Sequence, residues 1–444
     1  MSRDGLTTST LGRFARMGGL VGRVGVSVIG GQAAGLLRDG PTKRLKKAVN
    51  MVRNAARIAS TLGEMKGAAM KVGQMLSLHE GLLPDEVATI LSVLQNDAPS
   101  VSFERMEAQL RRELDNFDDL FESIEAEAFA SASIGQVHRG VLRDGREVAV
   151  KIQYPDADRM VKADLTNMKV LFGNLVGLFT DIDFEPIWIE VQERLVEELD
   201  YHHEAENARR MAEMYADDPK IIVPQVINEG TTQRVLTMAF EEAIPPTEAT
   251  SDRYPQDLKD EWGGALFEFT LRGLFKHRFL HADPNFANFA FRDDGSLVVY
   301  DYGCIKRVPE NIATGYARLM DALLKRKKTA FPTLLKELGV SRGGDIPLPR
   351  TTTDPYVDLM QEVLRASPPY TFGDDAAFYK AIYDLGVTNW QEASDIRFPR
   401  DMVFIDRTLG GLFGTWGKLR ATGPWRKLLR KCTAPLAEAT KAAA

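Results

Sequence analysis

The chain has 444 residues, a hydrophobic share of 44% and a charged share of 27%, which excludes a disordered or fibrous protein and favours two or three folded units. The net charge of −6 and the pI of about 5.7 give the whole molecule no attraction to nucleic acid, so no nucleic-acid partner is expected. Two cysteines, Cys304 and Cys432, cannot build a disulfide framework, and a reducing compartment such as the cytoplasm is expected.

Residues 1–42 form a basic, glycine-rich arm. Nine Lys and Arg residues precede position 49, against two acidic residues. No apolar run is expected to span a bilayer, because the best stretch, from Met17 to Leu37, is interrupted by glycines, Arg23 and Gln32. The arm either docks peripherally on the inner face of a membrane or packs on the folded part of the chain.

Residues 43–125 are expected to form a helical extension. Apolar side chains recur at steps of three and four from Val49 to Met75, which predicts a helix over residues 43–78 with one buried stripe. Pro84 and Pro99 delimit a helical hairpin, and a charged amphipathic helix is predicted from Phe103 to Ile124.

The pattern changes to β-structure near Phe129. Val-rich strands are predicted from Gly135 to Leu142 and from Glu147 to Gln153, joined by a turn that contains Asp144 and Gly145. The second strand carries the sequence Val-Ala-Val-Lys ending at Lys151, which matches the protein-kinase strand whose Lys contacts the α and β phosphates of ATP. A solvated Lys near a strand end is the alternative.

The stretch from Ala130 to Val137 lies in register with the phosphate loop GxGxxGxV of protein kinases, except that its first two glycines are alanines. Each added Cβ restricts φ and keeps the backbone N–H groups further from the phosphates than glycine would. Packing of small residues or a helix cap is the alternative. The predicted nucleotide contacts in this loop are Ala130, Ser131, Ala132, Ser133, Gly135 and Val137.

A helical region is predicted from Asp156 to Asp217, and strands are predicted from Ile221 to Glu229 and from Arg234 to Phe240. The helical region contains an acidic cluster with Glu198, Asp200 and Glu204, in which Asp200 and Glu204 would share a helical face. A protein kinase needs a helical Glu that pairs with the strand Lys, and Glu198 and Glu204 are both candidates. Met238, on the second strand, occupies the hinge and is a further candidate for contacting the nucleotide.

The most specific pattern runs from His281 to Asn288 and resumes after a short hairpin at Tyr300-Asp301-Tyr302-Gly303. In protein kinases the catalytic Asp precedes an Asn by five positions, and the Asp of a DFG motif follows a hairpin. Asp283, Asn288 and Asp301 reproduce this order and spacing. Asn288 and Asp301 are therefore predicted to bind Mg²⁺, and Asp283 to orient or deprotonate a phosphoryl acceptor.

Together with Lys71, Gly73 and Gln74, which form a KxGQ motif, these segments resemble the UbiB/AarF family of atypical kinases, also known as the coenzyme Q kinase-like family. The resemblance covers roughly residues 10–310 and includes the Ala-rich loop and an ExD element at Glu198 and Asp200. It implies a two-lobed α+β protein-kinase-like fold with an N-terminal helical extension. The division expected is an arm (1–42), the extension (43–125), an N-lobe with a helical insertion (126–242) and a helical C-lobe (243–444).

The resemblance also implies ATP and Mg²⁺ as cofactors, a role in ubiquinone biosynthesis, and quinone-pathway lipid intermediates or biosynthetic proteins as partners. The extension would cover the place where a protein kinase binds its peptide, and Lys71 and Gln74 would then act in the active site. A solvated Lys71 on an amphipathic helix is the alternative. Two other functions stay open: a small-molecule phosphotransferase, or a nucleotide-dependent scaffold that presents lipids with little catalysis.

Overall fold

The computed structural model describes residues 72, 101–132, 134–155, 157–158, 165, 168–170, 172–173, 184–343, 345–373, 396 and 399–442. Val72 is a fully buried helical residue, in agreement with the predicted buried stripe at that position. The rest of the helix predicted over residues 43–78, the hairpin between Pro84 and Pro99, and the basic arm lie outside the described residues.

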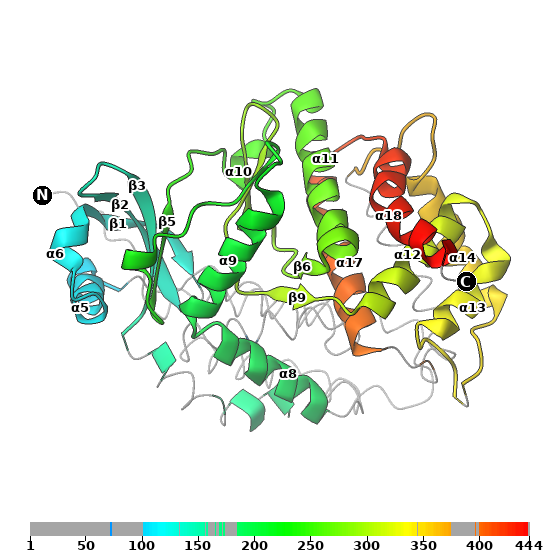
Figure 1. The fold of residues 1–444 in the computed structure, drawn as a ribbon, viewed down its shortest axis with the longest axis horizontal. Coiled ribbons are helices and arrows are strands. Elements are labelled where there is room, and N and C mark those ends of the chain that lie inside the picture. Colours follow the sequence, from blue (N-terminus) through cyan, green and yellow to red (C-terminus); the bar gives the residue numbers. More distant parts are fainter. Residues whose placement is uncertain are drawn as a thin grey trace, which may run out of the picture. The chain divides into compact units, whose positions relative to one another are not determined.

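The chain divides into two compact units, whose elements are labelled in Figure 1. Unit 1 comprises Met1–Asp200 and Thr232–Leu236, and unit 2 comprises Tyr201–Thr231 and Thr237–Ala444. The four-part division expected from the sequence stays a prediction.

A four-stranded sheet has the order β1 (Phe121–Ala132), β2 (Gly135–Leu142), β3 (Glu147–Gln153) and β5 (Val235–Ala239). The two strands predicted as a hairpin are confirmed with the same bounds as β2 and β3. In the turn between them, the Leu142 amide donates to the Arg146 carbonyl oxygen at 2.9 Å, and Gly145 has a φ of +86°. This left-handed conformation favours glycine, which explains the Asp-Gly signal in the sequence.

One face of β2 and β3 is buried. Val148, Val150 and Ile152 on β3 are fully buried, whereas Ala149 and Lys151, which alternate with them, are partly exposed. Helix α5 (Phe103–Glu113) packs on the buried face: the Val101 amide donates to Gln136 Oε1 at 3.1 Å, and the rings of Phe103 and His138 lie 5.4 Å apart. The opposite face of the two strands is therefore the one that can meet a ligand.

The helix predicted from Phe103 to Ile124 is wrong in its second half. Helix α5 ends at Glu113, α6 occupies only Phe117–Leu120, and β1 begins at Phe121 rather than near Phe129. Asp115 and Asn116 between the helices favour turns over helix. The Glu- and Ala-rich β1 forms a strand because it pairs with β2 along its length, and this tertiary pairing overrides local helix propensity.

The helical region predicted from Asp156 to Asp217 contains α8 (Phe184–Glu197) in unit 1 and α9 (Tyr201–Tyr215) in unit 2. Between them the Leu199 and Asp200 amides donate to the carbonyl oxygens of Val196 and Glu197, both at 3.1 Å, and form a turn. Asp200 therefore lies outside the helix, and the expectation that Asp200 and Glu204 share one helical face is wrong.

Unit 2 contains two small sheets. β6 (Phe279–His281) pairs antiparallel with β9 (Ile305–Arg307), while β8 (Leu297–Val299) lies between β4 (Ile221–Ile222) and β7 (Phe289–Phe291). The β7–β8 hairpin is confirmed, with Gly295 in its turn at a φ of +78°. The strand predicted from Ile221 to Glu229 is shorter than expected, because Pro224 cannot donate a ladder hydrogen bond.

The other elements described in unit 2 are helices, and they bury an aromatic core that includes Trp262, Trp416 and Trp425. The Trp416 indole donates to the Gly263 carbonyl oxygen at 3.1 Å. None of the described helices is both long and apolar enough to cross a membrane. The helices are α10 (Pro246–Ala249), α11 (Gln256–Arg272), α12 (Glu310–Leu324), α13 (Phe331–Glu337), α14 (Arg350–Val363), α17 (Arg400–Leu419) and α18 (Trp425–Ala442), with short helical turns η2 (Asn228–Gly230), η3 (Gly273–His277), η4 (Phe286–Asn288) and η5 (Lys328–Ala330).

Candidate functional site

The Ala-rich loop is a tight β-hairpin. Ala130 pairs with Val137, Ser131 with Gln136, and Ala132 with Gly135 across β1 and β2. This strand–turn–strand form is the one that a phosphate loop takes, and it excludes a helix cap. Ser133 lies outside the described residues.

Gly135, the third glycine position of the loop, is required by the sheet itself. A Cβ built on Gly135 would lie 2.3 Å from the Ile152 carbonyl oxygen on β3, closer than side-chain carbons approach backbone atoms. The glycine thus permits close pairing of β2 with β3. The two alanines, by contrast, stand on β1, where the chain accepts a Cβ.

Lys151 lies beside this hairpin. Val137 on β2 is the register partner of Lys151 on β3, so Ala130, Val137 and Lys151 form one row across three strands. Directly opposed residues in antiparallel strands point to the same face, and both Val137 and Lys151 are partly exposed. Three predicted nucleotide contacts are therefore brought together on the open face of the sheet.

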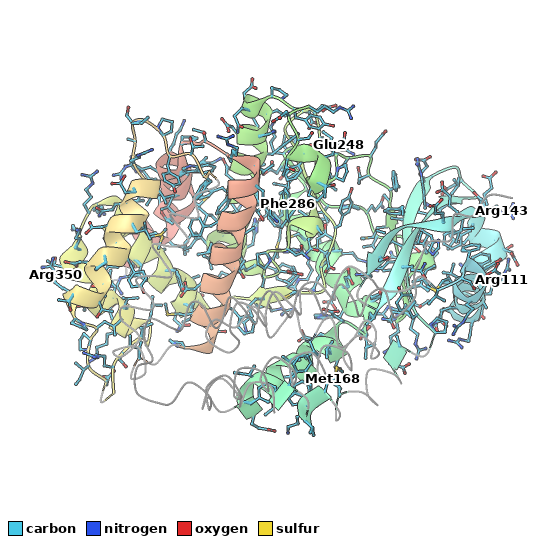
Figure 2. The ribbon with its side chains drawn as sticks, turned by 180° about the vertical axis from the view of Figure 1, so that it is seen from behind. Arg111, Arg143, Met168, Glu248, Phe286 and Arg350 are labelled. Carbon is cyan, nitrogen blue, oxygen red and sulfur yellow. The ribbon has the colours of Figure 1, made fainter. Side chains whose placement is uncertain are left out.

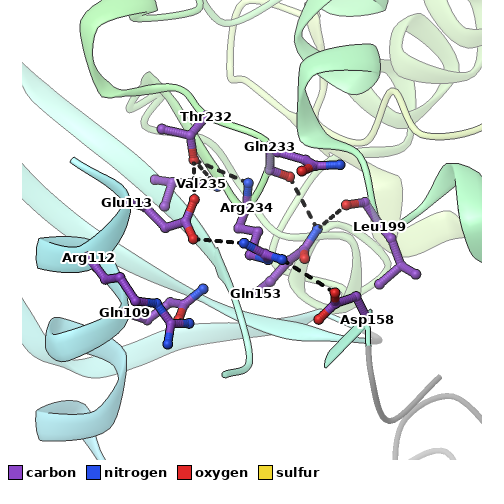
Figure 3. Close-up of polar contacts among 10 residues, drawn as sticks. All are labelled: Gln109, Arg112, Glu113, Gln153, Asp158, Leu199, Thr232, Gln233, Arg234 and Val235. Carbon is purple, nitrogen blue, oxygen red and sulfur yellow. Dashed lines mark hydrogen bonds and ion pairs between the residues drawn. The ribbon is translucent and has the colours of Figure 1, made fainter. Parts of the chain in front are cut away.

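A polar network fixes the end of β3 within unit 1 (Figure 3). The Gln153 side-chain amide donates to the Leu199 carbonyl oxygen at 2.9 Å and reaches the Gln233 carbonyl oxygen at 3.5 Å. Leu199 stands between Glu198 and Asp200, the two acidic residues of the ExD element, which are both partly exposed. Gln153 thus connects the strand of Lys151 to the turn that carries these carboxylates.

Arg234 is the centre of the same network. Its guanidinium contacts Glu113 on α5 at 3.1 Å and Asp158, after β3, at 3.3 Å, as Figure 3 shows. The hydrogen bond and charge of Glu113 raise the pKa of Arg234, so the pair stays ionised. The ion pairs hold α5, the segment after β3 and the start of β5 in one arrangement.

In unit 2, Glu204 is buried on α9 beside the Asp-Tyr-Gly segment. It is 4% exposed, and a Cβ built on Gly303 would lie 3.9 Å from Glu204 Oε2 and 3.3 Å from Asp301 Oδ1. One turn further along the same helix, the Asn207 amide donates to the Tyr302 carbonyl oxygen at 3.1 Å. Helix α9 therefore supports the segment that contains Asp301.

Asp283, Asn288 and Asp301 are brought together by backbone hydrogen bonds in unit 2. The Ala282 amide donates to the Cys304 carbonyl oxygen at 2.8 Å, which extends the β6–β9 pairing towards Asp283. The Tyr300 amide donates to the Asn288 carbonyl oxygen at 3.0 Å, so Asn288 and Asp301 stand at the open end of the β7–β8 hairpin. The Asn288 side chain also reaches the Asp283 carbonyl oxygen at 3.5 Å.

Side-chain contacts orient the two aspartates. Asp301 Oδ1 accepts from the Gly303 amide at 2.9 Å, and Asp283 Oδ1 accepts from the Asn285 amide at 3.1 Å. Tyr302, which replaces the Phe of a DFG motif, is fully buried and donates its hydroxyl to the Val299 carbonyl oxygen. Burial, with the charges of Glu204 and Asp301, raises the pKa of Tyr302 well above its ordinary value, so this donor keeps its proton.

The oxygen ligands present fit a magnesium–nucleotide complex. Among the described residues, no group of three or more His, Cys, Asp and Glu side chains is arranged to hold a metal ion by itself. Magnesium uses one or two protein ligands when phosphates and water supply the others. Asn288 and Asp301 would supply two such ligands, and the nucleotide would have to complete the coordination.

Of the remaining predicted site residues, the structure describes Met238 but not Lys71 or Gln74. Met238 lies on β5, is 6% exposed and forms a bridge with Val226. Lys71 and Gln74 lie outside the described residues. Sequence reasoning missed Gln153 and Asn207, although each is a polar residue close to a motif, and Asn207 lies three positions after Glu204 on α9.

A sequence model of the ABC1 atypical kinase-like domain matches residues 93–334, which is more than half of the chain and includes every candidate site residue except Lys71 and Gln74. The chain belongs to the ABC1 atypical kinase-like family. The resemblance to UbiB/AarF kinases seen in the motifs is thereby confirmed.

Individual relatives agree with the ABC1 assignment. The chain is 33% identical to the atypical kinase COQ8B, mitochondrial, of Danio rerio over 93% of this chain and 66% of that protein. It is 28% identical to the atypical kinase coq-8, mitochondrial, of Caenorhabditis elegans, over 95% and 57% of the respective chains. The chain therefore spans 66% and 57% of the length of these two relatives.

A solved structure has a similar fold. The structure of Rv3197 from Mycobacterium tuberculosis, in complex with erythromycin, superposes with a TM-score of 0.65 at 26% identity, covering 89% of this chain and 98% of that one. The two-lobed α+β kinase-like fold predicted from the sequence is confirmed.

Proposed function

We propose that this chain is a UbiB-type atypical kinase or ATPase that binds Mg-ATP and supports ubiquinone biosynthesis, acting on or with lipid intermediates at a membrane. The observation that carries the proposal is the joining of Asp283, Asn288 and Asp301 by backbone hydrogen bonds in one unit. Three oxygen-bearing side chains in kinase order, held at the ends of two strand pairs, are the parts that phosphoryl transfer requires.

Each side chain has a proposed role. Asn288 and Asp301 bind Mg²⁺, and Asp283 orients the acceptor or takes its proton. Lys151 and the Ala-rich hairpin contact the phosphates, with Ala130 and Val137 on the same row as Lys151. Met238 contributes to the nucleotide site from the hinge strand.

Glu198 and Glu204 both remain candidates for the acidic residue that supports Lys151. The buried position of Glu204 makes its charge costly unless a cation compensates it, whereas Glu198 is partly exposed in a turn. We therefore expect Glu204→Gln to weaken nucleotide binding more than Glu198→Gln.

Lys71 and Gln74 are proposed to restrict acceptor access to the active site, as the KxGQ motif implies. Lys71→Ala should then change ATP turnover or autophosphorylation while melting temperature and ATP binding stay near those of the wild type.

The basic arm, residues 1–42, is proposed to dock on the anionic inner face of a membrane. The rest of the protein would lie in the cytoplasm. Equal pelleting of full-length and arm-deleted protein on anionic liposomes would remove the membrane role.

A nucleotide-dependent scaffold with little catalysis is the second candidate. It is favoured by the alanines at positions 130 and 132, which stand in a hairpin that otherwise has the form of a phosphate loop. A small-molecule phosphotransferase would share the Asp283 and Asp301 chemistry but gives no role to Lys71.

Quinone profiling of a deletion strain tests the pathway and separates the candidates. Rescue by the wild-type gene but not by Asp283→Asn supports catalysis, because Asp283 is not assigned to metal or nucleotide binding. Rescue by both genes supports a scaffold. A deletion strain with normal quinone content contradicts the pathway.

A further inference from the structure

Helix α17 is held rigidly within unit 2. The Trp416 indole near its end donates to the Gly263 carbonyl oxygen of α11 at 3.1 Å, and Asp406 in its middle accepts from the Tyr316 hydroxyl of α12 at 2.7 Å. Both aromatic side chains are buried. Two neighbouring helices therefore fix the position of α17, which lies beside α11 in Figure 1.

The same helix packs against the loop that contains Asp283. Gly411 lies so close to Pro284 that a Cβ built on Gly411 would come within 2.4 Å of Pro284 Cγ and 2.5 Å of its Cβ. Thr408, one turn earlier and fully buried, places its hydroxyl 3.5 Å from the Ala282 carbonyl oxygen. Lys418 stands over the Phe286 ring at 5.4 Å, and Figure 2 shows Phe286 beside this helix.

The first turns of α17 reach the strand that follows the Asp-Tyr-Gly segment. Asp401 forms an ion pair with Lys306 on β9 at 3.2 Å, and the Lys306 ammonium also stands 4.9 Å from the centre of the Phe404 ring. One helix thus contacts the segments on both sides of the candidate magnesium ligands. This helix lies beyond residue 334, where the match to the kinase-like domain ends.

We propose, on the basis of the phosphoryl transfer proposed above, that α17 positions the catalytic loop, with Gly411 as the residue that sets the place of Asp283 through Pro284. Gly411 touches no reacting group in this account and acts through its neighbour. The absence of a Cβ lets the helix backbone approach the proline ring. Because α17 is packed tightly on α11 and α12, its backbone fixes the position of that ring. Asp283 precedes Pro284 in the chain, so fixing the proline also fixes the position of Asp283.

The chain offers a matched control. Gly410 and Gly411 are neighbours in the same helix, and a Cβ on Gly410 would meet nothing within 4 Å. Both substitutions by Ala raise helix propensity equally, so their difference reports only the contact with Pro284. The test compares wild type, Gly410→Ala and Gly411→Ala in full-length protein, measuring the Kd for Mg-ATP and the kcat and KM for ATP consumption.

Gly411→Ala is expected to lower kcat by about 10- to 100-fold, the loss that a misplacement on the order of 1 Å causes, while the Kd for Mg-ATP changes by less than about twofold. Gly410→Ala should resemble the wild type in all three quantities. Replacing Pro284 by Gly in the Gly411→Ala background removes the atoms that the new methyl group meets, and it also removes the ring that positions Asp283. The double variant should therefore regain the melting temperature of the wild type while its kcat stays low.

Equal kcat values for Gly410→Ala and Gly411→Ala, beside an active wild type, would overturn the positioning role and leave the proposed function intact. If the Gly411→Ala protein does not fold, the contact with Pro284 is supported only when the double variant with Pro284→Gly folds. If neither the single nor the double variant folds, the positioning role is contradicted. A wild type that neither binds nor consumes Mg-ATP contradicts the proposed function itself, and the positioning role with it.

Discussion

The His281 ring nitrogen Nε2 donates a hydrogen bond to the backbone carbonyl oxygen of Asp301 at 2.5 Å. His281 is the first residue of the segment that contains Asp283 and Asn288, and Asp301 is the acidic residue of the Asp-Tyr-Gly segment. The β7–β8 hairpin separates the two segments in the chain. His281 is 5% exposed, and its ring packs against those of Phe289 and Tyr302. A buried side chain therefore couples the loop of Asp283 to the proposed magnesium ligand.

His281→Phe should test this coupling, because it keeps the ring packing and removes the donor. The loss is expected to cost about 1–3 kcal/mol of unfolding free energy and to weaken Mg-ATP binding. Thr433→Val is a suitable control, since the Thr433 hydroxyl is buried and donates to the Leu429 carbonyl oxygen at 2.9 Å on α18. Urea unfolding and Mg-ATP titration of both variants provide the comparison. Equal Mg-ATP affinities in the two variants would contradict the coupling.

Ala132→Gly, alone or with Ala130→Gly, is expected to change the affinity or preference for ADP and ATP, because the hairpin amides can then approach the phosphates more closely. The stability cost is about 0.5–1 kcal/mol. Gly135→Ala should cost about 1–3 kcal/mol instead, because the new methyl group meets the Ile152 carbonyl oxygen. Identical ADP and ATP titrations for the wild type and the glycine variants would remove the idea.

Arg234→Met should lower the unfolding free energy by about 1 kcal/mol, since the ion pair with Glu113 is partly buried, at 32% and 13% side-chain exposure. Arg146→Met is the control, because Arg146 and Asp144 are 52% and 53% exposed and solvent screens their pair, so its removal should leave the unfolding free energy nearly unchanged. Denaturant midpoints for both variants decide the matter. Equal losses would show that the network in unit 1 adds no stability beyond that of a surface pair.

Acid should destabilise the protein partly through His277. Burial, with the charges of Lys276 and Arg272, lowers the pKa of His277 from 6.5 to about 4 in the folded state. The unfolded chain binds the proton first as pH falls, so this contribution to stability is complete above pH 6.5 and is lost between about pH 6.5 and 4. His277→Gln should flatten the pH dependence of the melting temperature in that window. An unchanged profile would assign the acid sensitivity to other groups, such as the buried His138, whose pKa is also lowered by burial.

The sequence predicted those parts in which local signals and tertiary structure agree. The β2–β3 hairpin has alternating apolar residues and an Asp-Gly turn, and the spacing of Asp283, Asn288 and Asp301 identified the loops that the structure joins. The start of β1 was missed because a Glu- and Ala-rich segment favours helix until a neighbouring strand pairs with it. The proposed role of α17 could not be predicted, because the sequence does not distinguish Gly410 from Gly411. Only the structure shows that Pro284 lies against Gly411 and not against Gly410.

The most direct test of magnesium–nucleotide binding compares two isosteric substitutions. Asp301 and Asp294 each accept a hydrogen bond on Oδ1 from the amide two positions on, at 2.9 Å in both cases, and Asn preserves that acceptor while removing the charge. Thermal stabilisation by ATP is measured with magnesium and with EDTA for the wild type, Asp301→Asn and Asp294→Asn. We predict that the magnesium-dependent shift is largely lost in Asp301→Asn and retained in Asp294→Asn. A full magnesium-dependent shift in Asp301→Asn would contradict the account.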